Sequence, residues 1–584
     1  MKKRVKRILA LVLSATMVLG VTACGSDKGK VKGRTKITFW ATVNVNTQDT
    51  YLKVVDDFNA SQSEITVQFV PQTSGFASSL STSLRGTNTP DVVVVPSQSY
   101  KTFVDEGLLE CLDEYAENDE NENFSLEDFF SDCLNIYSYN PETGYTNTGK
   151  DFYAIPAGCS SNTIVYNVDL FEEQQINLVS VPEDELEDYN SKNGTKLLPH
   201  GYYVYDSAPA EGMAARSDGK YHVFNNRIPM NWTELVELAK IFTKSYNSSS
   251  TSTYGYLTEY WFQMAWSVGG DCVQWDEEKG QNVFTLGDDS PNYLVTGSEG
   301  VEVNGNKYSE GEVLTWADGK YVEANASDKK IAGYLDSQKL YKLPSTREAF
   351  TEFLRWSQTT DKAVTSDKNG YGISPKPTAL GNDSMQAFFT TSEVAMLESG
   401  TSTYFKIGQD MNSLGKKWDI APMYQYREYN DDGTPKTVNG TKVYGTRRTV
   451  SEAEAYAVPK NSTKKEAAWK FISYMTGTDG QREFMKLNRY MPNQKSLAYS
   501  DEFLNETSNF APTSKIVGVE AAENGSGGDW TYLDNMEWIV GWSDVLNTKV
   551  REGLMTLDQF FEDPDVQKTD ETLKKYSVKH NAQN

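Results

Sequence analysis

Short apolar runs alternate with amphipathic segments in the first part of the chain. Residues 37–40 form a β-prone run, residues 65–70 alternate as a strand does, and four consecutive valines follow Asp91. An unbroken apolar run of this length is typical of a strand buried on both faces of a parallel sheet. Residues 51–59 have helical spacing, with one predicted apolar face made of Leu52, Val55 and Phe58. This rhythm predicts an open α/β sheet.

A second α/β region begins near residues 155–156. It contains a predicted strand at residues 163–166 and a predicted helix at residues 233–243, which Asn231 or Thr233 would cap. Two stretches, 182–226 and 276–340, interrupt it. We interpret both as β-rich insertions, the second because it carries the turn signals Asn304-Gly305 and Asp318-Gly319.

The last third of the chain returns to helical patterning. A hairpin is predicted for residues 426–447 around Asp432-Gly433. From Lys464 onward the spacing indicates a helix whose inward face is Ala467, Ala468, Phe471, Ile472 and Met475.

The N-terminus has the pattern of an export signal. A basic head precedes a largely apolar run from Ile8 to Ala23, which is shorter than the roughly 20 residues of a membrane-spanning helix. Cys24 stands where cleavage is expected, as in a bacterial lipoprotein signal, although an ordinary cleaved signal with a chance cysteine is the alternative. We expect residues 1–23 to be removed, Cys24 to be lipidated, and residues 24–36 to form a flexible tether on the extracytoplasmic face of the cell membrane.

Charge and residue usage exclude several functions. The chain has 56 basic and 81 acidic residues, so its net charge is −25, and no basic stripe offers a surface to nucleic acid. The five cysteines include no CxxC pair, and the three histidines show no zinc-binding spacing. We expect the cysteines after Cys24 to be buried free thiols, with a Cys111–Cys133 bridge as the alternative. Catalysis by His200 or His222 is not expected, because both lie in a polar stretch typical of a surface excursion.

Several motifs occur in an order that resembles a known family. The chain is similar to the extracellular solute-binding proteins of ABC importers, in the oligosaccharide-binding, maltose-binding-protein-like group. The matching segments span nearly the whole mature chain: residues 37–40, 90–93, 107–109, 152–156, 166–171, 231–235, Trp266 with 269–270, 395–396 with Gly400, 418–422 and 464–471.

The resemblance implies an α/β, two-lobed periplasmic-binding-protein-like fold (type II), each lobe an open α/β sheet. It places the N-lobe at 37–155 and 455–510, the C-lobe at 156–454 and 511–570, and a polar tail at 571–584. Residues 155–156 and the stretch before residues 457–459 match hinge crossings. A monomer that encloses an oligosaccharide and passes it to ABC permease subunits and their ATPase is the implied function, without a required cofactor.

A sugar site needs aromatic rings for the C–H faces of the sugar and planar polar groups for its hydroxyls. On the N-lobe, Trp40 and Asn44 follow the first strand, and Ser97 and Gln98 follow the valine strand. The resemblance places further candidate ligand-binding residues on the C-lobe: Glu259, Tyr260, Trp261, Trp266, Ser402, Tyr404, Trp530, Tyr532 and Trp538. The tryptophans at 232, 356 and 469 have helical spacing and are predicted to be core.

One acidic loop has the alternating oxygen ligands of a calcium site. Its candidate ligands are Asp119, Asn121, Asn123, Ser125 (through its carbonyl), Glu127 and Asp128. The loop departs from the EF-hand pattern, since Phe124 replaces the turn glycine and Phe130 the bidentate acid. A solvated acidic loop is the alternative, and any calcium here would be structural.

Two other functions remain open at this point. A cell-surface-anchored glycoside hydrolase needs only a suitably spaced carboxylate pair, which 81 acidic residues could supply. A receptor for a non-sugar ligand, such as a peptide or an anionic glycan, would share the same fold. The chain is not expected to be an enzyme.

Overall fold

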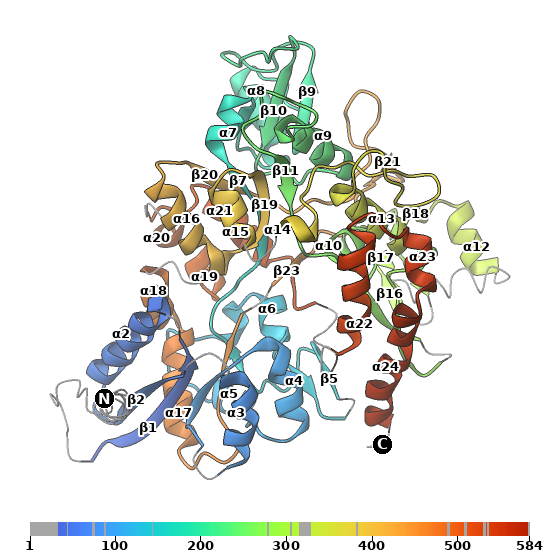
Figure 1. Cartoon of the computed structure of the whole chain (residues 1–584). Coiled ribbons are helices and arrows are strands. Elements are labelled where there is room, and N and C mark those ends of the chain that lie inside the picture. The colour runs from blue at the N-terminus through green and yellow to red at the C-terminus, as the bar shows by residue number, and fades with distance from the viewer. Residues whose placement is uncertain are drawn as a thin grey trace, which may run out of the picture.

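The computed structural model describes residues 33–581 except 44, 73–75, 87–88, 143, 277–278, 304–305, 315–328, 381–383, 452, 487–490, 507–510, 529–532 and 534–536. The signal, Cys24, most of the tether and the turns at Asn304-Gly305 and Asp318-Gly319 therefore lie outside the described residues. Two lobes are visible in Figure 1, with the blue N-terminal elements in the lower one.

The N-lobe is built on a five-stranded sheet with the order β2-β1-β3-β24-β6. Its strands are β1 (Thr35–Thr42), β2 (Ile65–Gln72), β3 (Val92–Val95), β24 (Ala455–Ala457) and β6 (Ile155–Pro156). Strand β1 runs parallel to β2 and β3, whereas β24 is antiparallel to both β3 and β6. The valine strand is buried on both faces, as predicted, because Val92 and Val94 join one apolar cluster and Val93 and Val95 another.

Helices cover both faces of this sheet. Helices α2 (Val45–Ser61) and α17 (Lys465–Thr476) pack on one face, and α3 (Phe76–Arg85) and α4 (Ser97–Asp105) on the other. The predicted inward face of α17 is confirmed, although Ala467 is only partly buried. The predicted face of α2 is wrong at Leu52, which is 41% exposed, because Tyr51 and Val54 point into the core instead.

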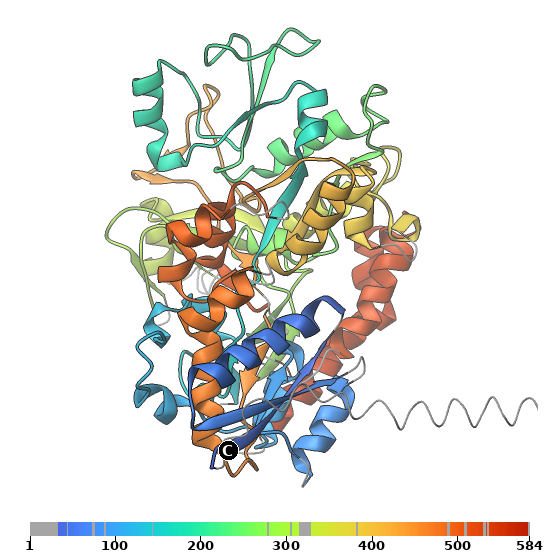
Figure 2. The same cartoon turned by 90° about the vertical axis from the view of Figure 1, so that its left-hand side faces the viewer.

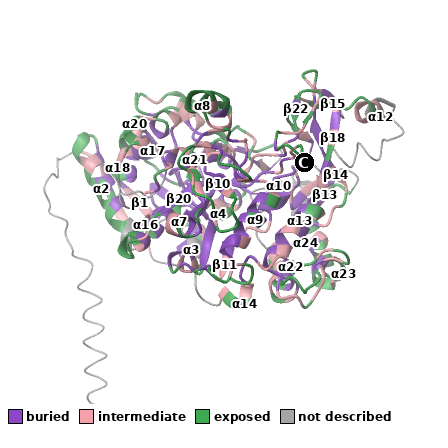
Figure 3. Ribbon diagram, turned by 90° about the horizontal axis from the view of Figure 1, so that it is seen from above, coloured by how far each residue is buried: buried purple, intermediate pink, exposed green. Residues whose placement is uncertain are grey.

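The C-lobe has a four-stranded sheet with the order β11-β19-β7-β20. Its strands are β11 (Tyr254–Leu257), β19 (Val394–Gly400), β7 (Asn162–Asn167) and β20 (Trp418–Ala421). Helix α9 (Trp232–Phe242) begins with a capping box in which Asn231 and Glu234 bond each other's backbone N–H groups, so Asn231 is the cap. Buried residues run through the interior of the elements (purple in Figure 3), and the buried apolar side chains form separate clusters in the two lobes.

Short bridges join the two lobes where the chain crosses between them. Strand β23 (Thr449–Val450) pairs with β25 (Gly525–Ser526), and single bridges connect Cys159 with Met491 and Ser161 with Ser451. Cys111, Cys133, Cys159 and Cys272 are all free thiols, as expected. Cys111 is half-buried and the other three are buried.

The first insertion forms a module at the end of the C-lobe that is remote from the N-lobe (Figures 1 and 2). It contains α8 (Leu186–Asn193), β9 (Tyr202–Tyr205) and β10 (Tyr221–Asn225), and β10 also pairs with β8 (Asn177–Val179). It is therefore mixed α/β rather than only β-rich. His200 and His222 of this module are both buried, so the prediction that they lie in a surface excursion is wrong. The His200 ring is hydrogen-bonded to Glu234 at 2.7 Å and to the Gly433 carbonyl at 2.8 Å.

The second insertion is β-rich, as predicted. It contributes β13 (Gln281–Phe284), β14 (Pro291–Val295), β15 (Val301–Val303), β16 (Asn306–Tyr308) and β17 (Val313–Leu314), followed by α12 (Lys329–Asp336) and β18 (Leu340–Ser345). The predicted hairpin between 426 and 447 is present, with β21 (Thr437–Val438) paired to β22 (Thr441–Lys442) and a bridge from Tyr429 to Pro435 around Asp432-Gly433.

Residues 571–581, the first part of the predicted polar tail, are helical. They belong to helix α24 (Pro564–Asn581). Val566 and Leu573 lie on the same face of this helix, and both are buried in the C-lobe core. Within the described part of the chain, every helix is too short or too polar to cross a membrane.

Candidate functional site

A groove lies where the N-lobe, the C-lobe and the crossing segments meet. Its cavity of about 310 Å³ is within the range of small-molecule sites. Asp132 and Asn147 line it from the N-lobe, and the opposite side is formed by Thr446, Arg447, Arg448, Glu523, Asn524, Gly525 and Ser526. Residues from both lobes could therefore contact one solute.

The two arginines of this groove differ in how they are held. Arg448 donates to Asp271 at 2.7 Å and to Ser526 at 2.8 Å, and its guanidinium lies 4.3 Å from the ring of Trp266. Arg447 has a single ion-pair partner among the described residues, Glu520 at 3.9 Å, and donates no hydrogen bond within that part of the chain. Burial lowers the pKa of Arg447. The Arg447 side chain is 37% exposed, so its donors remain available for a ligand.

The described N-lobe candidates differ in position and in accessibility. Trp40 is half-buried on β1 and meets Phe76 edge-on at 5.9 Å. Ser97 is half-buried and Gln98 is exposed, both in the first turn of α4. Asn44 lies outside the described residues. None of these side chains lines the described groove.

The segment after β11 is held by contacts within the C-lobe. Glu259 accepts two hydrogen bonds from Arg551, at 2.7 and 2.8 Å, so its carboxylate is already paired. Tyr260 and Trp261 are half-buried. The Trp261 ring stands edge-on to Trp542 at 4.5 Å, which leaves part of its surface accessible.

Three predicted stacking residues lie in the core rather than on a surface. Trp266 is 0% exposed, Trp538 is 1% exposed and Tyr404 is 7% exposed. The Tyr404 hydroxyl is hydrogen-bonded to Thr163 of the C-lobe sheet. Apolar packing in the core accounts for these aromatic residues, because a buried ring has no free face on which a sugar could stack. Ser402 is exposed, and Trp530 and Tyr532 lie outside the described residues.

The acidic loop at residues 119–128 is bonded to the helices behind it. Asn121 donates to Ser473 at 2.9 Å, Asn123 donates to Asp479 at 3.1 Å, and Asp128 accepts from the Ser496 N–H at 3.0 Å. Its side chains diverge toward different partners, and its carboxylates do not converge on one point in the described structure. Calcium binding at this loop stays a prediction.

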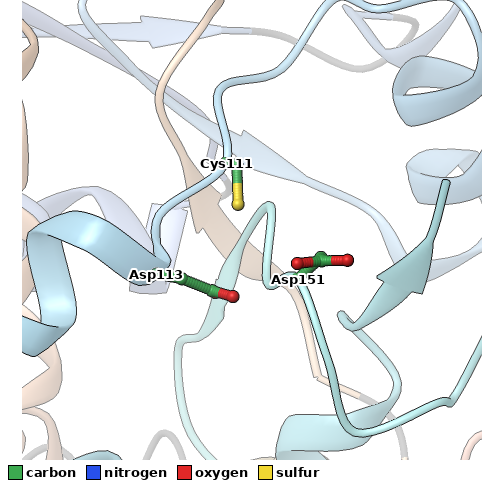
Figure 4. Close-up of side chains that lie close together, drawn as sticks. All are labelled: Cys111, Asp113 and Asp151. Atoms are coloured by element: carbon green, nitrogen blue, oxygen red, sulfur yellow. The ribbon is translucent and has the colours of Figure 1, made fainter.

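A different group of ligand-type side chains converges in the N-lobe. The Cys111 sulfur and carboxylate oxygens of Asp113 and Asp151 lie within 4.8 Å of one another (Figure 4). Burial raises the pKa of both Cys111 and Asp113, which favours their uncharged forms. Asp113 also accepts the Phe152 N–H at 2.8 Å. No motif in the sequence indicates this group, because Asp151 is remote from Cys111 and Asp113 along the chain.

A fully buried carboxyl group sits in the C-lobe sheet next to the crossing segments. Glu398 on β19 accepts hydrogen bonds from Thr258 at 2.7 Å and from Asn162 at 3.1 Å. The Asn162 carbonyl in turn accepts from Thr449 of β23, which links Glu398 to a crossing segment. Burial raises the pKa of Glu398 to about 7, although its hydrogen-bond donors oppose the shift.

Comparison with known proteins gives one family and a set of similar folds. A family model described as bacterial extracellular solute-binding protein matches residues 53–511. A search of the curated proteins gave no match. The similar solved structures share less than a fifth of their residues with this chain, so they show the fold alone.

Three of these structures illustrate the similarity. The ABC substrate-binding protein Lmo0181 from Listeria monocytogenes, in complex with cycloalternan, has a TM-score of 0.54 at 16% identity and covers 93% of this chain and 98% of its own. The cyclic alpha-maltosyl-1,6-maltose binding protein from Arthrobacter globiformis has a TM-score of 0.53 at 14% identity, covering 93% and 100%. UgpB from Mycobacterium tuberculosis, in complex with glycerophosphocholine, has a TM-score of 0.53 at 15% identity, covering 94% and 99%.

The buried Glu398 makes stability depend on pH. Its pKa in the folded protein, about 7, lies above the ordinary glutamate value of 4.5, so the folded state binds this proton more tightly than the unfolded chain does. Stability from this group is fully present below about pH 4.5 and is lost as the pH rises through about 7. Glu398→Gln should therefore flatten the dependence of the melting temperature on pH between about 5 and 8. Glu393→Gln, at an exposed glutamate of the same lobe, is the control and should leave the pH dependence of the melting temperature unchanged. The same pH dependence in Glu398→Gln as in the unaltered protein would contradict this assignment.

Proposed function

The chain belongs to the bacterial extracellular solute-binding proteins, and from this premise we propose that it captures a neutral oligosaccharide between its lobes and delivers it to the permease of an ABC importer. The observation that carries the proposal is the groove to which both lobes contribute, with Asn147 on one side and Arg447 on the other. A solute that contacts both sides stabilises the closed arrangement of the lobes, and a permease can recognise that arrangement.

Oligosaccharide is the ligand class that the side chains support best. The amides of Asn147 and Asn524 and the uncommitted guanidinium of Arg447 offer planar donors to hydroxyl groups. Half-buried Trp40 and Trp261 are available as stacking rings near strand ends. Two of the similar structures carry saccharide ligands in their names, whereas UgpB was solved with glycerophosphocholine, so a solute with a phosphate group is the competing ligand.

The proposal treats the protein as a receptor rather than an enzyme. The family to which it belongs is one of binding proteins. Two carboxylates line the groove, Asp132 and Glu523, and Glu523 is already engaged by Lys495 at 3.4 Å and by the Tyr499 hydroxyl at 3.3 Å. Nearby, Asp271 is paired with Arg448, and Glu520 with Arg227 and Arg447. A glycoside hydrolase would require two carboxyl groups free to act on the sugar.

We also propose a lipid anchor at Cys24 and an extracytoplasmic location on the cell membrane. The support is the basic head, the short apolar run and the position of Cys24 directly after Ala23. One acyl chain anchors a protein only marginally, so the mature form should carry two or more chains.

Substitutions on the two sides of the site should weaken binding. Asn147→Ala, in the groove, and Trp261→Ala, at a half-buried C-lobe ring that is not part of the groove lining but is proposed to stack on the sugar, should each raise the Kd for the best-bound neutral oligosaccharide, by roughly 5- to 150-fold for the ring, taking about 1–3 kcal/mol for a stacked aromatic. Isothermal titration calorimetry, after a screen of neutral, anionic and phosphorylated solutes, would measure this.

The matched control for the ring is Trp232→Ala. Trp232 is also half-buried, but its indole N–H donates to Ser267 at 3.0 Å and its ring packs edge-on against Tyr426, so its loss should lower the melting temperature and leave the Kd unchanged. Binding of phosphorylated solutes alone would contradict the neutral-sugar proposal.

The anchor has a separate test. Cys24→Ser should prevent formation of the lipid thioether, so the protein should be released from membranes or remain uncleaved. Fractionation and intact-mass analysis of the exported protein would show which occurs. Unchanged membrane association together with unchanged processing would rule out lipidation at this residue.

A further inference from the structure

A second, larger cavity adjoins the groove between the lobes. Its volume is about 710 Å³, and it shares Thr446, Arg447 and Asn524 with the smaller cavity. One of its walls comes from the second insertion and the other from the hairpin at residues 426–447. Its remaining lining residues are Tyr308, Glu310, Gly311, Glu312, Val313, Gln425, Gly440, Thr441, Lys442, Tyr444 and Gly445.

The wall from the insertion is attached firmly to the C-lobe. Leu294 and Leu343 of the inserted sheet pack with Val443 of the hairpin in a buried apolar cluster. The Thr441 hydroxyl accepts the Gly297 N–H at 2.8 Å and donates to Glu310 at 2.6 Å. These contacts hold the inserted wall at a fixed position, so the cavity is a built feature of the lobe.

The base of the wall lies directly on the C-lobe. Gly269 has a φ of +81°, and a Cβ at this position would lie 2.4 Å from Val313 Cγ1. Only glycine therefore lets the insertion approach so closely at this point.

The lining of the larger cavity suits a neutral, hydroxyl-rich chain. Glu310 and Glu312 are balanced by Lys442 and Arg447, so no single charge dominates. Tyr308 and Tyr444 are half-buried aromatic residues of this lining, and the Arg427 guanidinium lies 4.1 Å from the Tyr444 ring. The amides of Gln425 and Asn524 and the hydroxyl of Thr446 also line the cavity. Arg447 stands at the junction, where its uncommitted donors could bond a sugar residue that passes from one cavity to the next.

We propose that the second insertion extends the solute site, so that this receptor selects oligosaccharides long enough to fill both cavities. The inference rests on the proposed function, since it assumes a saccharide in the groove between the lobes. It assigns the role of chain-length selection to the wall residues Tyr308 and Lys442, with Arg447 contacting the sugar at the junction.

The test is calorimetric titration of the full chain with size series of neutral α- and β-linked glucans, from disaccharide to octasaccharide. Affinity should rise with length until both cavities are filled. Tyr308→Ala should remove that rise, lowering affinity for the longest sugars about 5- to 20-fold, while affinity for the shortest sugar that binds stays within about twofold. Arg447→Gln should weaken binding of every length.

Two further variants keep the test decisive. Lys442→Ala removes an exposed side chain from the hairpin wall of the same cavity and should lower affinity for long sugars even if Tyr308→Ala destabilises the insertion. Tyr246→Ala, on an exposed tyrosine remote from both cavities, is the control and should leave the length series unchanged. Equal affinity for short and long sugars, or wall variants that bind long sugars normally, would overturn the extended site and leave the proposed function standing. A chain that binds none of the saccharides would overturn both.

Discussion

The architecture depends on one strand that arrives late in the sequence. Strand β24, at residues 455–457, lies between β3 and β6 in the N-lobe sheet, although the C-lobe sheet and both insertions precede it along the chain. Its central residue, Tyr456, is fully buried in the N-lobe core. The N-lobe sheet is therefore complete only when the chain has returned from the C-lobe, and pairing over such a separation carries a high loop-closure entropy. The same return places Arg447 and Arg448 directly before the crossing, where both lobes can reach a solute.

Local pattern was sufficient for the sheets but not for the site. Burial of the β3 valines and capping by Asn231 both depend on residues close together in the sequence, and both predictions were correct. The burial of Trp266 and Trp538 could not be predicted in this way, because only tertiary packing decides whether an aromatic ring is enclosed. The groove residues Asp132 and Asn147 had no local signal either, since their partners lie hundreds of residues away.

Global charge was a poor guide to the local electrostatics of the groove. The chain has a net charge of −25, yet two arginines stand at the groove, one fully engaged and one with free donors. Asp271 neutralises Arg448, and Glu520 is shared between Arg227 and Arg447. The Arg448 guanidinium therefore supports the wall of the groove next to Trp266, whereas the Arg447 guanidinium can bond a hydroxyl-rich ligand. The second insertion supplies one wall of the larger cavity beside the groove.

The central claim is that a solute is held between the two lobes and draws them together. Small-angle X-ray scattering of the mature chain, with and without a saturating oligosaccharide identified by titration, tests this most directly. The account predicts a smaller radius of gyration with the sugar bound. It predicts no such change for Asn147→Ala at a sugar concentration that lies below the Kd of this variant. A saturated complex whose scattering is identical to that of the free protein would contradict enclosure between the lobes.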